Sequence, residues 1–136
     1  MDKKEILDFI TKNPIGFLAT ADGTTPHVRA FGLYRADENG IIYFTQSAKD
    51  VYKQMMKNPE IEVCYWANSV QIRVAGKVKP VEDMEMKKGV LKVAPFLQPQ
   101  IDANGWDFLK LFCLKGKAYV ADMAAPPGAP KTWVEL

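Results

Sequence analysis

Three polar side chains in the middle of the chain have the types and spacing of an anion site. Thr45, Ser47 and Lys49 follow the apolar pair Tyr43-Phe44 and come just before a segment with helical apolar spacing. Hydroxyl groups, an ammonium group and the free backbone N–H groups at a helix start can together surround a phosphate. The segment therefore predicts an anion site, although a capping serine followed by a solvated lysine would leave the same pattern.

Arg29 is a candidate second cation, since the chain has eighteen basic residues of which only three are arginines. It lies in an alternating segment, 27–34, whose other face carries small side chains such as Val28 and Ala30. If the small face is turned toward a packed centre, Arg29 emerges on the outer wall beside Phe31. There it could join the anion site, or it could form an ordinary surface ion pair.

Gln71 lies in a second alternating segment, 70–78, in which Ile72 and Val74 are expected to be buried. Its amide can both donate to and accept from a polar heterocycle, and it can equally be an ordinary exposed strand residue. His27 is the only histidine, and the two cysteines lie in separate apolar segments. Neither a metal site nor a disulfide scaffold is predicted.

Composition limits the class of protein that can carry these residues. The 136 residues are 48% apolar and 25% charged with a net charge of +2, which fits one globular domain spanning 1–136 and excludes a disordered chain. The small charge argues against a nucleic-acid binder, leaving an OB-like module that stacks bases on Phe31, Tyr43 and Trp66 as a minor alternative. No apolar run is long enough for a membrane span and no signal peptide is evident, so a cytoplasmic protein is expected.

Cap and turn signals predict the elements that must position these residues. A capping box at Asp2 and Glu5 begins a first helix, Ser47 caps a second that ends at Asn58-Pro59, and a third is expected over 82–94, followed by a loop over 95–105. A proline-rich connector, 124–131, precedes a C-terminal edge strand. The other predicted strands are 15–20, 27–34, 41–45, 61–67, 70–78, 107–114 and 117–122.

Short connections between these strands predict an antiparallel arrangement, and the helices do not alternate with the strands. The fold class expected is therefore mainly β: a closed or split antiparallel barrel of about six or seven strands with two or three short helices. A barrel of this size fills its centre with side chains, so a sizeable ligand must bind outside it.

Several segments, taken in order, resemble the pyridoxamine 5′-phosphate oxidase-like flavin split barrels. The resemblance implies a homodimer that binds FMN in clefts at the subunit interface, with NADH or NADPH commonly supplying electrons in the reductase-like members. The segments that carry it, within residues 14–80, are Gly16-Phe17-Leu18-Ala19-Thr20, Asp22-Gly23, Pro26-His27-Val28-Arg29, Tyr43-Phe44-Thr45, Ser47-Ala48-Lys49, Asn58-Pro59 and Gln71-Ile72-Arg73-Val74-Ala75-Gly76.

The resemblance also assigns cofactor-binding residues by position. The second-strand residues follow the flavin ring, the residues around the helix start meet the phosphate, and a glutamine lies near the polar edge of the ring. Lys53 is an alternative to Lys49 at the phosphate, and Trp106 is a candidate to cover the ring. The seven positions are Arg29, Ala30, Phe31, Thr45, Ser47, Lys49 and Gln71.

Departures from the oxidase pattern shape the expected function. Tyr34 stands where the oxidase carries a basic residue, and no arginine or histidine follows Arg73, so the substrate-binding Arg and His pair has no counterpart. Oxidation of pyridoxamine phosphate is not expected, and the chain is more similar to the nitroimidazole-reductase and general-stress branches. The resemblance implies an FMN-dependent, nicotinamide-linked oxidoreductase acting on a small molecule, with no catalytic side chain assigned. A non-catalytic flavin carrier or sensor is the alternative, and heme or a deazaflavin could replace FMN.

Overall fold

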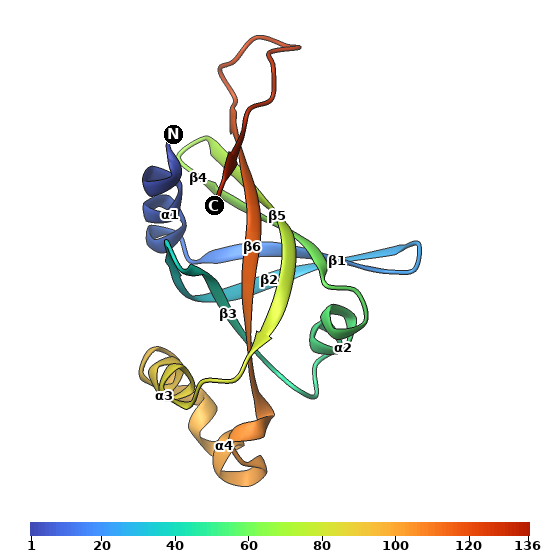
Figure 1. The fold of residues 1–136 in the computed structure, drawn as a ribbon, viewed down its shortest axis with the longest axis vertical. Helices are drawn as coiled ribbons and strands as arrows, with labels where there is room; N and C mark the ends of the chain where they lie inside the picture. The colour runs from blue at the N-terminus through green and yellow to red at the C-terminus, as the bar shows by residue number, and fades with distance from the viewer.

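Alternating apolar residues build seven strands, six of which close into an antiparallel barrel (Figure 1). The computed structural model describes all residues 1–136. The strand order is β3-β2-β1-β4-β5-β6-β7, and pairing of β3 with β6 closes the ring. This confirms the predicted mainly β barrel. The strands are β1 Ile15–Asp22, β2 Thr25–Asp37, β3 Gly40–Gln46, β4 Glu60–Ala67, β5 Val70–Val81, β6 Leu109–Asp122 and β7 Trp133–Glu135.

The predicted tight turn between β4 and β5 is confirmed. Asn68 and Ser69 have φ values of 51° and 62°, as a two-residue type I′ hairpin requires. Ala67 pairs with Val70 across the turn. The turn therefore fixes the register that buries Ile72, as the alternating pattern predicts.

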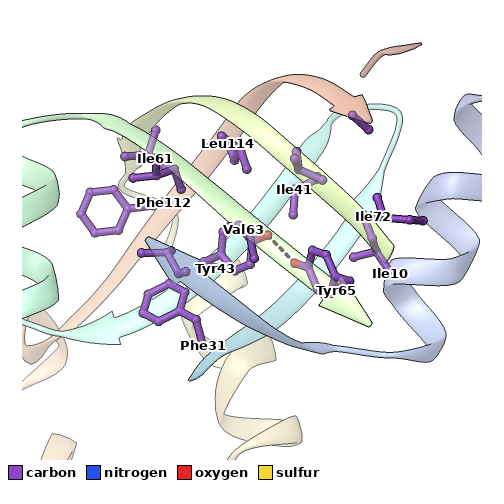
Figure 2. Packing of buried hydrophobic residues seen from close by; sticks show 14 of the residues in the cluster. Ile10, Phe31, Ile41, Tyr43, Ile61, Val63, Tyr65, Ile72, Phe112 and Leu114 are labelled. Atoms are coloured by element: carbon purple, nitrogen blue, oxygen red, sulfur yellow. Dashed lines mark hydrogen bonds between the residues drawn. The ribbon is translucent and has the colours of Figure 1, made fainter. Parts of the chain in front are cut away.

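The centre of the barrel is filled by one apolar cluster, drawn in Figure 2. Within it the hydroxyl groups of Tyr43 and Tyr65 hydrogen-bond to each other, and burial raises the pKa of both phenols well above the ordinary value. Two helices pack against this cluster from opposite sides of the barrel (Figure 1): α1, Lys3–Lys12, and α2, Asp50–Lys57. Because side chains fill the centre, a large ligand has no room there.

The prediction of a loop over 95–105 is wrong. This region folds as α3 Met84–Val93, the short helix η1 Pro95–Leu97, α4 Gln98–Asn104 and the short helix η2 Trp106–Phe108. Pro95 and Pro99 occupy first-turn positions, where the missing N–H has no intrahelical partner to lose, so they begin helices rather than prevent them. The segment from α3 to η2, called the insert below, brings the number of α-helices to four.

The insert packs on one side of the barrel around a second, smaller cluster that includes Val90, Leu97 and Ile101. Gly89 allows this docking because a Cβ there would lie 2.1 Å from the hydroxyl oxygen of Tyr34 on β2. The glycine inside the predicted helix is thus explained by the ring that passes over it.

The two strands predicted over 107–122 are one continuous strand, β6. Lys115-Gly116 resembles a turn in sequence, but Gly116 pairs with Gly76 inside a ladder of twelve residue pairs with β5. A Cβ on Gly116 would lie 2.0 Å from the carbonyl oxygen of Ala75, so the glycine permits a close approach of two strands.

The predicted edge strand is confirmed: β7 pairs with β6, and Trp133 lies opposite Tyr119. The proline-rich connector before it projects away from the barrel (Figure 1). None of the helices combines the length and the apolarity that crossing a membrane would require.

Candidate functional site

The face on which Arg29 lies is opposite to the one expected from the sequence. Phe31 is buried among the core residues beside Tyr43 (Figure 2), whereas the side chain of Val28 is 71% exposed. The odd-numbered residues of β2 therefore face inward at this point. Arg29 pairs with buried Leu18 of β1 and lies toward α2. The alternation of small residues in β2 gave the wrong inward face, because small side chains can lie on the outer wall of a barrel as well as in its centre.

Arg29 is held entirely by neutral acceptors. Its Nη1 donates to Thr20 Oγ1 at 2.7 Å and to the carbonyl oxygen of Leu18 at 3.4 Å, and its Nη2 donates to Gln54 Oε1. Burial lowers the pKa of the guanidinium and Asp50 opposes that change. An arginine nevertheless stays protonated in a protein. Its positive charge is therefore fixed in place and not neutralised by an ion pair.

The other two arginines are paired with carboxylates. Arg35 Nε lies 2.9 Å from Asp37 Oδ2, and Arg73 makes two hydrogen bonds to Glu62 at 2.9 and 3.0 Å. These pairs match the surface ion pair considered as the ordinary role of an arginine. Of the three, Arg29 alone retains an unpaired charge.

Arg29 and Lys49 line the same hollow, which has a volume of about 510 Å³. Lys49 is the N-cap residue of α2 and forms no salt bridge, and no side chain caps the helix start. Asp50 is the single carboxylate in the lining, and His27 adds a group that can donate or accept. Two unpaired cations beside uncapped N–H groups are suited to a phosphate. The remaining lining residues are Val28, Ala48, Val51 and Gln54.

A second hollow, called the groove below, has a volume of about 450 Å³ and shares Lys49 with the first. Its floor includes the small residues Ala30 and Gly32 of β2, and its far wall is the end of α3 with η1. Phe96, on that wall, is 68% exposed. A largely apolar groove next to an anion hollow suits a planar ring that carries a phosphate on a short chain.

Thr45 supplies a buried hydroxyl group to the groove. The residue is 2% exposed, and its Oγ1 has no hydrogen-bond partner in the protein. Buried polar atoms are nearly always paired, so an unpaired one in the lining of a groove marks a position where a ligand can supply the partner. This observation is independent of the charges at Arg29 and Lys49.

Three further predicted positions lie outside both hollows. Ser47 is not the N-cap, because helix α2 begins two residues later than expected and the Ser47 N–H donates to the carbonyl oxygen of Phe108. Lys53 is exposed on α2, so Lys49 is the lysine that lines the hollows. Gln71 lies on the outer face of β5 opposite Trp66, and the structure does not bring it to either hollow.

The three tryptophans also lie away from the two hollows. Trp66 is 53% exposed on β4. Trp133 on β7 packs against Tyr119, with ring centroids 5.6 Å apart. Trp106 lies in the insert, where its carbonyl oxygen accepts a hydrogen bond from Lys87. No group of three or more His, Cys, Asp or Glu side chains is placed to hold a metal ion.

Sequence reasoning missed Thr20 and Gln54, the two side chains that hold Arg29. The signal for Gln54 was available: it lies three residues after Val51 and next to Met55, both buried, so it borders the inward stripe of α2. Thr20 is a buried hydroxyl in β1 that aligns with the Arg29 face only once the strand register is known. The wall that the insert adds to the groove was missed because residues 95–105 were expected to form a loop.

Residues 2–103 match the family model described as pyridoxamine 5′-phosphate oxidase. No curated protein matches the chain. Similar solved structures include a NimC/NimA family protein from Clostridium acetobutylicum, which is 25% identical, has a TM-score of 0.78, and is aligned over 98% of this chain and 92% of that one.

Two other solved structures share the fold at lower sequence identity. General stress protein 26 from Bacillus anthracis is 15% identical with a TM-score of 0.67, aligned over 97% of this chain and 99% of that one. A pyridoxamine 5′-phosphate oxidase-related, FMN-binding protein from Nostoc punctiforme is 14% identical with a TM-score of 0.66, aligned over 98% and 94%.

Proposed function

The chain belongs to the pyridoxamine 5′-phosphate oxidase family, and from this premise we propose that it binds FMN across the two adjoining hollows described above. The observation that carries the proposal is the convergence of Arg29 and Lys49, neither of them neutralised by an ion pair, on one hollow. The FMN-binding relative from Nostoc punctiforme, whose structure aligns over nearly the whole chain, supports the choice of cofactor.

In this proposal the phosphate occupies the hollow between Arg29 and Lys49, and the flavin ring lies in the groove on Ala30. The buried hydroxyl group of Thr45, which has no partner in the protein, gains one from the cofactor. Phe31 lines the groove from the core side and supports its floor. The residues present fit a phosphorylated planar ring in charge, in shape and in hydrogen-bonding capacity.

Bound FMN supplies the redox chemistry, since its ring accepts and donates electrons. The chain's own residues hold the phosphate, orient the ring and exclude water from one of its faces. The groove contains no histidine or carboxylate, so Lys49 is its only titratable side chain. We infer a nicotinamide-dependent oxidoreductase that acts on a small molecule other than pyridoxamine phosphate, for which the chain lacks a C-terminal Arg and His pair.

Titration of the protein with FMN tests the binding proposal. Arg29→Ala is expected to weaken FMN binding by about 1–3 kcal/mol, the contribution of a charge-assisted hydrogen bond. Lys49→Ala is expected to weaken it as well. Lys53→Ala is the matched control. This substitution also removes one positive charge, but Lys53 lines neither hollow. A protein that neither contains nor binds flavin, or an Arg29→Ala variant of unchanged affinity, would contradict the proposal.

A flavin carrier or sensor is the second candidate, favoured because Lys49 is the only acid or base group in the groove. Steady-state oxidation of NADH or NADPH with an artificial electron acceptor separates the two functions. Turnover by the FMN-loaded protein above that of free FMN supports the oxidoreductase. Tight FMN binding without such turnover supports the carrier.

We further propose that the protein is a homodimer in which a second copy covers the groove. The outer wall of β1, β2 and β4 carries exposed apolar side chains, with Phe17 50% and Trp66 53% exposed, and Ile15 belongs both to this wall and to the groove. A patch of this kind on a soluble domain marks an interaction site. Gln71 lies on β5 opposite Trp66 of this wall and lines neither hollow, so in such a dimer it would face the cofactor of the other copy.

Light scattering of the purified protein tests the dimer. Phe17→Glu is expected to shift the protein toward a monomer and to weaken FMN binding at the same time. Glu38→Lys, a charge change at an exposed turn residue, is the control. A wild-type monomer with full FMN affinity would contradict the dimer proposal.

A further inference from the structure

Gln54 lies at the centre of the hydrogen bonds that hold Arg29. Its Oε1 accepts from Arg29 Nη2 and, at 2.6 Å, from Thr20 Oγ1. Thr20 Oγ1 in turn accepts from Arg29 Nη1 at 2.7 Å. The three side chains thus form a closed ring of hydrogen bonds that joins β1, β2 and α2, and Gln54 and Arg29 both line the hollow.

This ring fixes which way the Gln54 amide is turned. A guanidinium has only donors, so the amide must present its oxygen to Arg29 and cannot present its nitrogen there. The Nε2 atom, with two N–H donors, has no hydrogen-bond partner within the protein. Gln54 therefore brings unused donors to the hollow in which Arg29 and Lys49 already place positive charge.

The neutrality of this amide matters as much as its donors. A carboxylate in the same place would keep the oxygen that holds Arg29, but it would cancel the arginine's charge and remove the free N–H groups. An apolar side chain of similar length would leave the charge and remove both the anchor and the donors. Of these three side chains, glutamine alone anchors the guanidinium and leaves its charge available.

We propose that Gln54 is a phosphate-binding residue of the cofactor site: its oxygen positions Arg29, and its amide nitrogen donates to the phosphate of FMN. The inference rests on the proposed function. It predicts that Gln54 distinguishes FMN from riboflavin, which has the same ring but no phosphate.

The test is a pair of fluorescence titrations, with FMN and with riboflavin, on the full-length protein. Wild type is expected to bind FMN more tightly than riboflavin. Gln54→Glu is expected to lower the ratio of the two affinities at least tenfold, and Gln54→Met severalfold, while riboflavin affinity stays within about twofold of wild type. Gln100→Glu introduces the same charge on the exposed surface of α4 and is expected to leave the ratio unchanged.

The outcomes separate this inference from the proposal beneath it. If wild type binds neither flavin, or binds both equally, the proposed phosphate site itself is wrong. If wild type prefers FMN but Gln54→Glu keeps the preference, the role of Gln54 is overturned. A parallel loss of both affinities also overturns it, because a side chain that only packs α2 would weaken both. Thermal unfolding confirms that each variant is folded, and Gln54→Met provides the measurement if the glutamate variant does not fold.

Discussion

Replacing Thr45 by valine is expected to stabilise the protein without ligand and to weaken its binding of FMN. The two effects have one cause: Thr45 Oγ1 is buried in the lining of the groove and has no hydrogen-bond partner. Valine keeps the β-branched shape that suits a strand, and it replaces the hydroxyl group by a methyl group. The pairing of β3 with β6 at this position uses backbone atoms and is unaffected.

The expected magnitudes follow from the burial of the hydroxyl group. An unsatisfied buried polar group costs about 1–3 kcal/mol, so Thr45→Val is expected to raise the free energy of unfolding of the apoprotein by that amount. If the hydroxyl donates to the flavin ring in the groove, its removal costs about 0.5–1.5 kcal/mol of FMN binding, which is about 2-fold to 13-fold in affinity. At a free FMN concentration of 100 times the wild-type dissociation constant, FMN stabilises wild type by about 2.7 kcal/mol. A tenfold weaker variant would gain about half as much.

Urea unfolding with and without FMN measures both effects on the same samples. Thr11→Val is the matched control, because Thr11 Oγ1 donates to the carbonyl oxygen of Leu7 at 2.8 Å and is already satisfied. That variant is expected to show no gain in stability and no change in FMN affinity. A Thr45→Val apoprotein no more stable than wild type would show that the hydroxyl already has a partner, and unchanged FMN affinity would refute the proposed contact.

Three further substitutions test the packing. Gly89→Ala is expected to lower the free energy of unfolding, measured in urea, by about 1–3 kcal/mol, because the new Cβ would collide with the hydroxyl oxygen of Tyr34. This cost outweighs the better helix propensity of alanine. Adding Tyr34→Phe should recover part of the lost stability. Burial raises the pKa of Tyr43 and Tyr65 above the unfolded value near 10, so the stability that they contribute is complete below pH 10 and is lost as pH rises beyond it. Tyr43→Phe should therefore reduce the alkaline slope of the unfolding free energy by about 1.4 kcal/mol per pH unit, and an unchanged slope between pH 9 and 11 would contradict the buried pair. Asp2→Ala removes the N-cap of α1 and should cost about 0.5–2 kcal/mol, measured by thermal or urea unfolding, with no effect on FMN titration.

The antiparallel, mainly β class of the fold was predictable because each rule that indicated it is local. Alternation in β5, the Asn68-Ser69 turn and the capping box at Asp2 act over a few residues, and the structure confirms all three. The C-terminal strand was predictable because proline confines the segment before it to a connector.

The errors concern features that only distant contacts decide. Nothing within β2 shows which face is inward, because that depends on Leu18 and Thr20 across the ladder. Lys115-Gly116 has the sequence of a turn, and only the pairing of Gly116 with Gly76 of β5 shows that the strand continues. In the candidate site, residue types could be predicted from the sequence, but the acceptors that leave Arg29 unpaired lie on other elements.

The long strand β6, which runs through most of the height of the molecule in Figure 1, belongs to both apolar clusters. Its Leu111 packs with the insert, and Leu114, three residues further on, packs inside the barrel. Opening either cluster must disturb the shared strand, so the barrel and the insert should unfold cooperatively, and the amides of β6 should be among the slowest in the chain to exchange with deuterium. The end of α3 and η1, which form the far wall of the groove, should therefore be as rigid as the barrel, and this wall would be a fixed surface rather than a lid.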